Sequence, residues 1–174
     1  EAWTTIPHVT QFDEADVSNL VALRAQYKAD FEKQGTKLTL LPFIIQALVR
    51  VLKQHPVFNS SLDETSEEIV LKEYVHLGIA VDTEQGLIVP VLRNADRKSL
   101  LELARDLDHL SQRARDRKLT ADDLRGGSFT ISNQGGIGGG HYTPIINPPE
   151  AAILGLGRAR PRPVAGPGDA AVVR

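Results

Sequence analysis

The sequence predicts an α+β domain in which helices cover one face of a sheet. Segments with apolar residues every three or four positions, typical of amphipathic helices, are mixed with short β-rich runs. Two of these runs flank a turn that ends in glycine, as in an antiparallel hairpin. The 174 residues, 41% hydrophobic and 24% charged, suit one globular domain. No linker rich in proline, glycine or serine is long enough to divide it.

The first third of the chain is expected to hold one short strand and two helices. Residues 9–13 alternate apolar and polar side chains, as a half-buried strand does. Asp16 then begins a helix with one apolar face, and Gly35 ends it. A second helix over residues 39–54 is apolar on nearly every face, so we expect it among the most buried elements.

Three strands are expected next. Turn residues at 59–61 precede a β-rich run at 68–72. Two further runs, residues 75–81 and 87–92, are expected to pair as a hairpin around the turn at 82–86.

The charged segment that follows predicts a helix. Ser99 and Glu102 have the spacing of a capping box at the start of an amphipathic stretch that runs to about Arg117. A further short helical turn is expected at Thr120, and residues 128–132 are expected to form a strand.

Glycine and proline dominate the remaining part. Five glycines fall within residues 135–140, and a rigid break at 147–149 precedes a small-residue strand at 151–157. The tail at 158–168, rich in proline, arginine and glycine, is expected to be a loop or a frayed end.

Composition argues against several classes of protein. With 20 Lys and Arg against 22 Asp and Glu, the net charge is −2, and no long basic block is present, so we expect no nucleic-acid partner. No run approaches the roughly 18 apolar residues of a membrane-spanning helix, and no signal-peptide pattern is seen, so we expect no membrane partner. The lack of cysteine excludes disulfides, thiolate metal sites and a cysteine nucleophile, which suits the cytosol.

Common site motifs find little support. The glycines at 135–140 lead neither to Gly-Lys-Ser/Thr nor to a G-x-G-x-x-G helix start, so they favour a tight turn past a ligand or second subunit over a phosphate loop. The five histidines lack the spacing and acidic neighbours of a metal site. Ser132 lies outside any G-x-S-x-G elbow. Its hydroxyl can donate to a developing oxyanion; a strand-end serine satisfied by backbone is the alternative.

Seven segments carry a recognisable combination of motifs: residues 6–10, 59–62, 75–83, 86–91, 96–100, 127–133 and 144–155. Together and in this order, over residues 3–160, they resemble the catalytic domain of the dihydrolipoyl acyltransferases of 2-oxo-acid dehydrogenase complexes.

The resemblance implies a chloramphenicol-acetyltransferase-like α+β fold and homotrimers with the active site between neighbouring subunits. It implies assembly of the trimers into a cubic or dodecahedral core, with 2-oxo-acid dehydrogenase and dihydrolipoamide dehydrogenase components as partners. The implied reaction moves an acyl group between coenzyme A and the dihydrolipoyl arm, a lipoate carried on a separate lipoyl domain. The implied location is the bacterial cytoplasm or the mitochondrial matrix.

Site residues follow from the same resemblance. In that family a histidine removes the thiol proton, and the serine that ends the Phe-Thr-Ile-Ser motif, here Ser132, stabilises the oxyanion. Arg24, on the polar face of the first helix, and Asp82, at the hairpin turn, are expected to contact coenzyme A or the subunit interface.

One family motif is missing. The histidine belongs to H-x-x-x-D-G, which occurs nowhere in the 174 residues, and His141 is not at the family's catalytic position. The chain also starts without methionine, so we expect residues 1–174 to be an incomplete catalytic domain, inactive by itself, with lipoyl and subunit-binding domains elsewhere. A scaffold that trimerises without catalysis is the alternative, and a free antibiotic-modifying acetyltransferase fits less well. The glycine stretch favours acetyl transfer over succinyl, and branched-chain acyl groups stay open.

Overall fold

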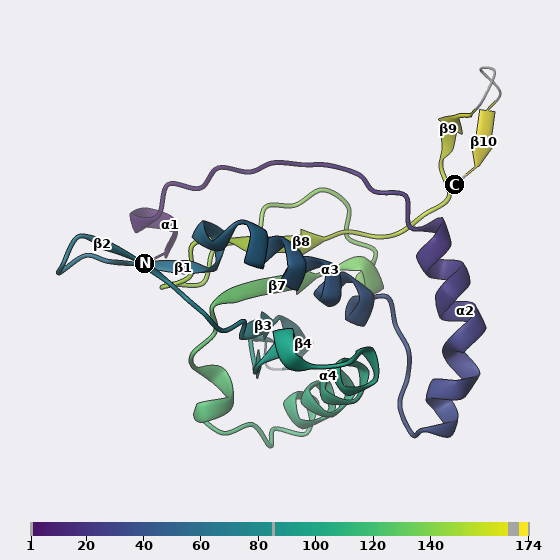
Figure 1. Cartoon of the computed structure of the whole chain (residues 1–174), viewed down its shortest axis with the longest axis horizontal. Helices are drawn as coiled ribbons and strands as arrows, with labels where there is room; N and C mark the ends of the chain where they lie inside the picture. The colour runs from purple at the N-terminus through teal and green to yellow at the C-terminus, as the bar shows by residue number, and fades with distance from the viewer. Residues whose placement is uncertain (1, 85, 167–170, 174) are drawn as a thin grey trace.

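A computed structural model describes residues 2–84, 86–166 and 171–173 and shows a mixed sheet with two helices packed on one face (Figure 1). Within these residues the central sheet has the strand order β6-β3-β7-β8. β3 runs parallel to β7, β7 parallel to β8, and β6 antiparallel to β3. The predicted α+β class is confirmed. The four strands are β3 (Leu77–Ile79), β6 (Val91–Leu92), β7 (Phe129–Asn133) and β8 (Ile153–Leu156).

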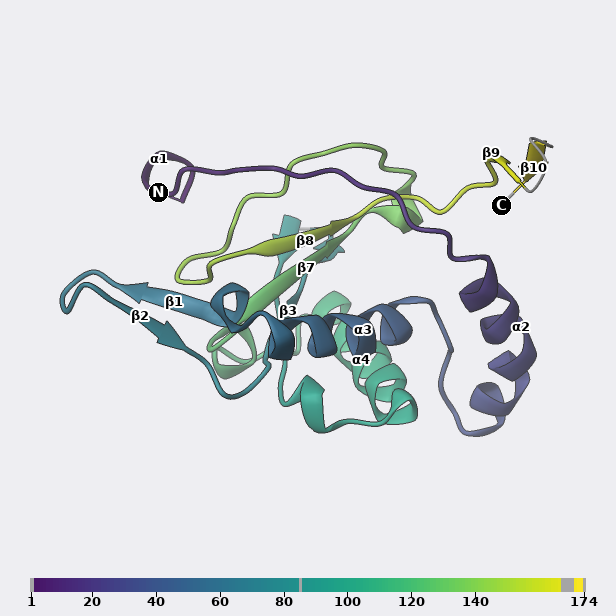
Figure 2. The ribbon, with the colours of Figure 1, turned by 45° about the horizontal axis from the view of Figure 1, so that its top comes forward.

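The core lies between this sheet and the helices α3 (Leu41–Gln54) and α4 (Leu100–Arg115). Alternate residues of a strand point to opposite faces, so Phe129 and Ile131 of β7 share the face that the helices cover. The opposite face carries the segment between β7 and β8 and the amino-terminal arm, which Figure 2 shows running above both strands.

α3 is buried along one face. Its buried side chains are Pro42, Ile45, Val49 and Leu52, spaced three or four residues apart, whereas Val51 is 47% exposed. The prediction that this helix is among the most buried elements is confirmed, because Ile45, Val49 and Leu52 lie in the core. The expectation that it is apolar on nearly every face is wrong. Polar side chains recur at the same helical spacing, at Gln46, Arg50 and Lys53, and form a second face.

α4 begins as predicted. Ser99 Oγ accepts a hydrogen bond from the backbone N–H of Glu102, and the Glu102 carboxylate accepts one from the backbone N–H of Ser99 at 2.8 Å. This capping box satisfies backbone donors that the first helical turn cannot. The expected helical turn near Thr120 is also confirmed, as the short helix η3 (Asp122–Leu124).

The helix α2 (Ser18–Lys33) confirms the predicted helix between Asp16 and Gly35 but lies at the edge of the molecule (Figure 1). The backbone N–H of Ser18 donates to the Asp16 carboxylate at 2.9 Å, which fixes the start of the helix. None of the described residues of α2 is buried.

The amino-terminal arm corrects one prediction. After the short helix α1 (Ala2–Thr5), residues 9–13 form no strand; the segment is extended, and Val9 is 97% exposed. Alternation alone cannot make a strand when no neighbouring strand offers backbone partners.

The predicted hairpin over residues 75–92 is confirmed and consists of two paired parts. β3 pairs with β6 away from the turn, and β4 (Val81–Thr83) pairs with β5 (Gly86–Ile88) next to the turn. Pro90 has no N–H to continue the ladder, but its carbonyl accepts from the Ile79 N–H at 2.9 Å. Gln85 of the predicted turn lies outside the described residues.

Two further hairpins differ from expectation. β1 (Ser60–Asp63) pairs with β2 (Glu68–Leu71), although residues 59–61 were expected to be only a turn. In the tail, β9 (Pro163–Ala165) pairs with β10 (Ala171–Val173), so the expected loop or frayed end is wrong there. Residues 167–168 of that prediction lie outside the described residues.

The remaining short helices are η1 (Pro56–Asn59), η2 (Ala95–Arg97) and η4 (Gly135–Ile137). No helix among the described residues has the length and apolarity needed to cross a bilayer.

Candidate functional site

Ser132 lies near the carboxyl end of β7, paired with Gly155 of β8. Because β3, β7 and β8 are parallel, their carboxyl ends meet at one edge of the sheet, a common place for ligand sites. Ile131 points into the core, so the half-buried Ser132 side chain points to the opposite face. Within the described residues, no hydrogen bond to another residue occupies the Ser132 hydroxyl. That hydroxyl is free to donate to a ligand.

The glycine-rich segment after β7 folds back on the sheet. The backbone N–H of Gln134 donates to the Leu156 carbonyl at 2.9 Å, Gly139 donates to the Gln134 carbonyl at 3.1 Å, and Arg158 donates to the Gly139 carbonyl at 3.1 Å. A Cβ at position 139 would lie 2.7 Å from Gln134 Cβ, so only glycine fits. The predicted tight turn is thus present, and we call residues 134–140 the glycine loop.

Tyr142 follows the glycine loop and reaches back to Ser132. Its hydroxyl donates to the backbone carbonyl of Ser132 at 2.5 Å. A Cβ at Gly155 would lie 3.2 Å from the phenol carbon and oxygen, so the ring lies directly on the backbone of β8. Sequence reasoning missed Tyr142 because no local motif marks it.

Glu150 is the buried carboxyl of this face. It is 5% exposed and accepts a hydrogen bond from Thr130 Oγ1 at 2.6 Å. Burial raises the pKa of Glu150 to about 7, although hydrogen bonds from Thr130 and Asn147 act in the opposite direction. Glu150 therefore ties the segment before β8 to the strand that carries Ser132. Its burial could not be predicted from the sequence, because the contact depends on how that segment folds over the sheet.

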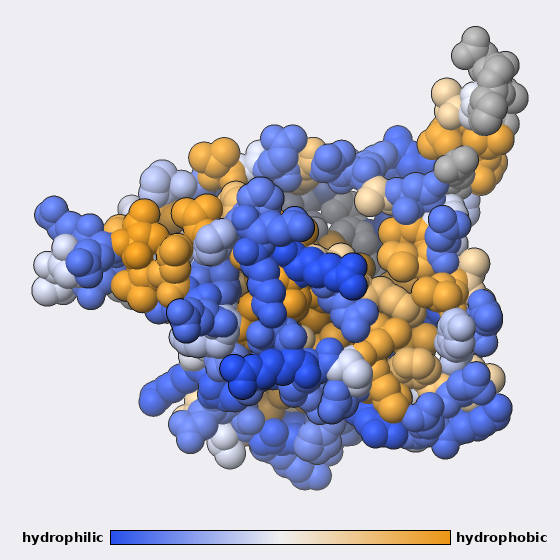
Figure 3. Space-filling view, viewed as in Figure 1, coloured by the Kyte–Doolittle hydropathy of each residue, from blue (hydrophilic) through white to orange (hydrophobic). Residues whose placement is uncertain are grey.

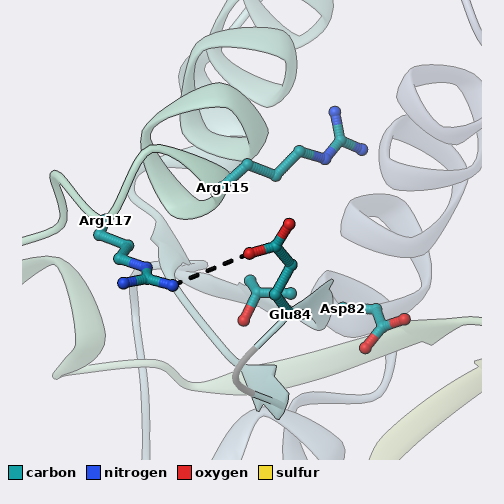
Figure 4. Close-up of a pocket in the computed structure, with 5 residues that line it drawn as sticks. Asp82, Glu84, Arg115 and Arg117 are labelled. Atoms are coloured by element: carbon teal, nitrogen blue, oxygen red, sulfur yellow. Dashed lines mark ion pairs between the residues drawn. The ribbon is translucent and has the colours of Figure 1, made fainter.

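Asp82 lies in β4, beyond the end of β3. The backbone N–H of Ala80 donates to the Ile131 carbonyl at 2.9 Å, which places the start of β4 beside the Ser132 end of β7. Asp82 is exposed and lines a surface hollow of about 450 Å³ together with Thr83, Glu84, Arg115 and Arg117. In Figure 4 the carboxylate of Glu84 points towards Arg117, with which it forms an ion pair of 3.8 Å, while Asp82 points away from that pair.

Arg24 is half-buried on α2, and its Nε donates to the Leu38 carbonyl at 2.9 Å. This bond ties α2 to the segment before α3. Both ribbon views show the carboxyl ends of β7 and β8 directed towards the side where α2 lies (Figures 1 and 2). Among the described residues no hydrogen bond or ion pair joins Arg24, Asp82 and Ser132 to one another.

The histidines lie away from Ser132 or have other contacts. His76 is at the amino end of β3, where its Nδ1 accepts from the Asn94 N–H at 3.0 Å. His8 Nε2 accepts from the Ile146 N–H at 2.9 Å, and the His141 ring meets Phe12 edge-on at 5.4 Å. In the part of the chain that the structure describes, no group of three or more potential ligands could hold a metal ion.

Several proteins of known identity are similar to this chain in sequence. The family described as 2-oxoacid dehydrogenases acyltransferase (catalytic domain) matches residues 1–174. The dihydrolipoyllysine-residue acetyltransferase component of the Pseudomonas aeruginosa pyruvate dehydrogenase complex is 50% identical over 163 residues, which are 94% of this chain and 30% of that protein. The corresponding Bacillus subtilis component is 48% identical over 165 residues, 95% of this chain and 37% of that protein. The chain thus spans about a third of the length of these relatives.

Solved structures agree with the fold. The Azotobacter vinelandii dihydrolipoamide acetyltransferase, studied for the catalytic roles of a serine, a histidine and an asparagine, has a TM-score of 0.95 and 50% identity. The cubic core of a pyruvate dehydrogenase multienzyme complex has a TM-score of 0.95 and 49% identity. Each comparison covers 99% of this chain and 71% of the other. The expected fold is confirmed, and the chain belongs to the 2-oxoacid dehydrogenase acyltransferase family, whose catalytic-domain pattern it matches throughout.

Proposed function

We propose that this chain forms part of the catalytic domain of a dihydrolipoyllysine-residue acetyltransferase of a pyruvate dehydrogenase complex. The observation that carries the proposal is the position of Ser132, whose free, half-buried hydroxyl lies where the parallel strands end. The same fold in Azotobacter vinelandii belongs to an acetyltransferase whose mechanism was studied through a serine. Acetyl is favoured over succinyl and branched-chain groups because these curated relatives are acetyltransferases.

The reaction exchanges one thioester for another. The sulfur of coenzyme A attacks the acetyl carbon, a C–S bond forms, and the carbonyl π electrons move to oxygen. Ser132 Oγ–H donates to this oxyanion, which then re-forms the carbonyl and expels the dihydrolipoyl sulfur. A thiol with a pKa near 8.5 is mostly protonated at neutral pH, so a general base must take the proton from coenzyme A and return one to the leaving sulfur.

We assign the base to a histidine in an H-x-x-x-D-G motif, which the 174 residues do not contain. The study of a histidine and a serine together in the Azotobacter vinelandii relative supports this assignment. A scaffold role without catalysis would apply if the complete protein lacked that motif.

Arg24 and Asp82 are the proposed contacts to coenzyme A. Asp82 is exposed next to the Ser132 end of β7, and Arg24 lies on the side to which β7 and β8 point. A structure with bound coenzyme A in which both side chains lay more than about 6 Å from the ligand and from a neighbouring subunit would remove them from the site.

Assembly is part of the proposal. The cubic core of the relative supports homotrimers built into a larger core, served by 2-oxo-acid dehydrogenase and dihydrolipoamide dehydrogenase components and by lipoyl domains. Since the relatives are bacterial, we place the complex in the cytoplasm.

The test is Ser132→Ala in the complete protein that carries this chain. We expect kcat for acetyl transfer from acetyl-CoA to dihydrolipoamide to fall roughly 10²–10³-fold, the usual effect of losing one oxyanion donor, while coenzyme A binds nearly normally. Ser111→Ala on α4, which also removes one serine hydroxyl, is the control. An unchanged kcat in Ser132→Ala, or an equal loss of coenzyme A affinity, would refute the role of Ser132.

A further inference from the structure

The side chain of Tyr142 contacts the backbone of Ser132 and not its hydroxyl. Its hydroxyl donates to the Ser132 carbonyl, so the Ser132 hydroxyl stays available to a substrate. The two residues are ten positions apart, and the glycine loop lies between them. The hydrogen bond therefore closes this loop over the end of β7.

Gly155 makes room for the phenol. Paired residues of neighbouring strands point to the same face, so the side-chain positions of Ser132 and Gly155 are adjacent. The Tyr142 ring takes the place of a side chain at Gly155, where an added Cβ would come within 3.2 Å of it. The ring thus lies on the face to which the Ser132 side chain points.

The glycine loop needs hydrogen bonds that restrain its backbone. Glycine has more backbone freedom than any other residue, and the loop contains five. The hydrogen bond from Gln134 to Leu156 fixes its near end to β8, and the bonds from Gly139 to Gln134 and from Arg158 to Gly139 hold its later part. On its far side, Tyr142 supplies the hydrogen bond back to Ser132 itself.

We propose that Tyr142 is a positioning residue, whose hydroxyl orients Ser132 and holds the glycine loop against the carboxyl end of β7. The inference rests on the proposed role of Ser132 as oxyanion donor. An oxyanion donor must meet the transition state within a few tenths of an ångström, so loosening the strand end lowers kcat more than it changes substrate binding.

Tyr142→Phe in the complete protein tests this, because only the hydroxyl is lost. We expect kcat for acetyl transfer from acetyl-CoA to dihydrolipoamide to fall roughly tenfold, less than in Ser132→Ala, with KM for acetyl-CoA changed by less than about twofold. Tyr74→Phe is the matched control, because it removes the hydroxyl of a tyrosine that precedes the amino end of β3 and packs against His76. A kcat equal to the parent value, or a loss expressed only in KM, would overturn the inference.

A double-mutant cycle separates positioning from a general structural effect. In the Ser132→Ala background, Tyr142→Phe should cause no further loss of kcat, because the donor it positions is gone. If the fold-losses of kcat of the two single variants multiplied in the double variant, Tyr142 would act independently of Ser132, and the inference would be overturned. If Ser132→Ala itself retains full activity, the proposed function fails first, and the two failures are distinguishable.

Gly155→Ala provides a second variant. The added methyl group must push the phenol by a few tenths of an ångström, so we expect a loss of kcat in the same direction that does not add to that of Tyr142→Phe. Full activity in Gly155→Ala would show that the exact position of the Tyr142 ring is unimportant and would count against the inference.

Discussion

Glu150 shows how a single buried carboxyl couples folding to pH. Below about pH 4.5, its ordinary pKa, the carboxyl is protonated in both the folded and the unfolded chain. Between pH 4.5 and 7 the unfolded chain loses this proton while the folded chain, with its pKa raised to about 7, keeps it. Folding stability therefore falls as the pH rises through this window, and the loss is complete above pH 7.

Glu150→Gln should abolish this contribution, because the amide stays neutral and its oxygen still accepts from Thr130. We expect parent and variant to have similar stability near pH 5, and the variant to gain up to about 3 kcal/mol at pH 8. Urea unfolding across this range measures the difference. Glu64→Gln, at an exposed carboxyl, is the control, and identical pH profiles for parent and Glu150→Gln would contradict the assignment.

Residues of the site differ in how visible they are in the sequence. The place of Ser132 near the end of a strand could be predicted, because residues 128–132 have the local pattern of a strand. Tyr142 and Glu150 could not, since each acts through a contact across the sheet that exists only after residues 134–150 have folded back. Arg24 and Asp82 could be placed on their elements, but the sequence could not show that Arg24 already donates to the Leu38 carbonyl.

At the scale of elements, the sheet depends on a close approach of β3 and β7. A Cβ at Gly78 would lie 2.6 Å from Thr130 Oγ1 and 2.9 Å from Val89 Cγ1. Thr130 is only 1% exposed and is held by Glu150, so it has little room to move.

Gly78→Ala is therefore expected to lower the free energy of unfolding by about 1–3 kcal/mol, the usual cost of overpacking a core. Gly136→Ala is the matched control, because a Cβ there meets nothing within 4 Å. Both variants can be compared by urea denaturation of the complete protein. Equal stability of Gly78→Ala and the parent would mean that the strands separate at little cost.

Local signals explain which elements could be predicted. The start of α4 is encoded in its own capping box, and the β4–β5 hairpin in its own turn, so neither needs a distant partner. Residues 9–13 have the alternation of a strand but pair with nothing in the described chain, whereas β1 looks like a turn and becomes a strand by pairing with β2. Asn59 helps to fix β1, because its amide donates to the carbonyls of Lys72 and Tyr74.

For the whole molecule, the β1–β2 hairpin presents an apolar surface. Leu62 and Ile69 are cross-strand partners, and each is 61% exposed. Figure 3 shows apolar side chains gathered over this hairpin. Contiguous exposed apolar groups of this kind favour an interface.

We therefore expect Leu62→Lys to weaken assembly of the complete protein, because burying an unpaired ammonium at an interface is costly. Sedimentation velocity should show a shift from large particles to smaller species, whereas Glu64→Lys, at the turn of the same hairpin, should leave the particle size unchanged. Particles of unaltered size in Leu62→Lys would place the interface elsewhere.

The hydrogen bond from Ile146 to His8 has a consequence for biosynthesis. It joins residues 138 positions apart and, with the contact between Phe12 and His141, holds the amino-terminal arm against the segment that carries Tyr142. On a ribosome that adds about 5–20 residues per second, the arm must wait roughly 7–28 s for its partner. The arm is therefore made well before the segment that it contacts, and this contact beside Ser132 cannot form until β3, β6 and β7 have been synthesised.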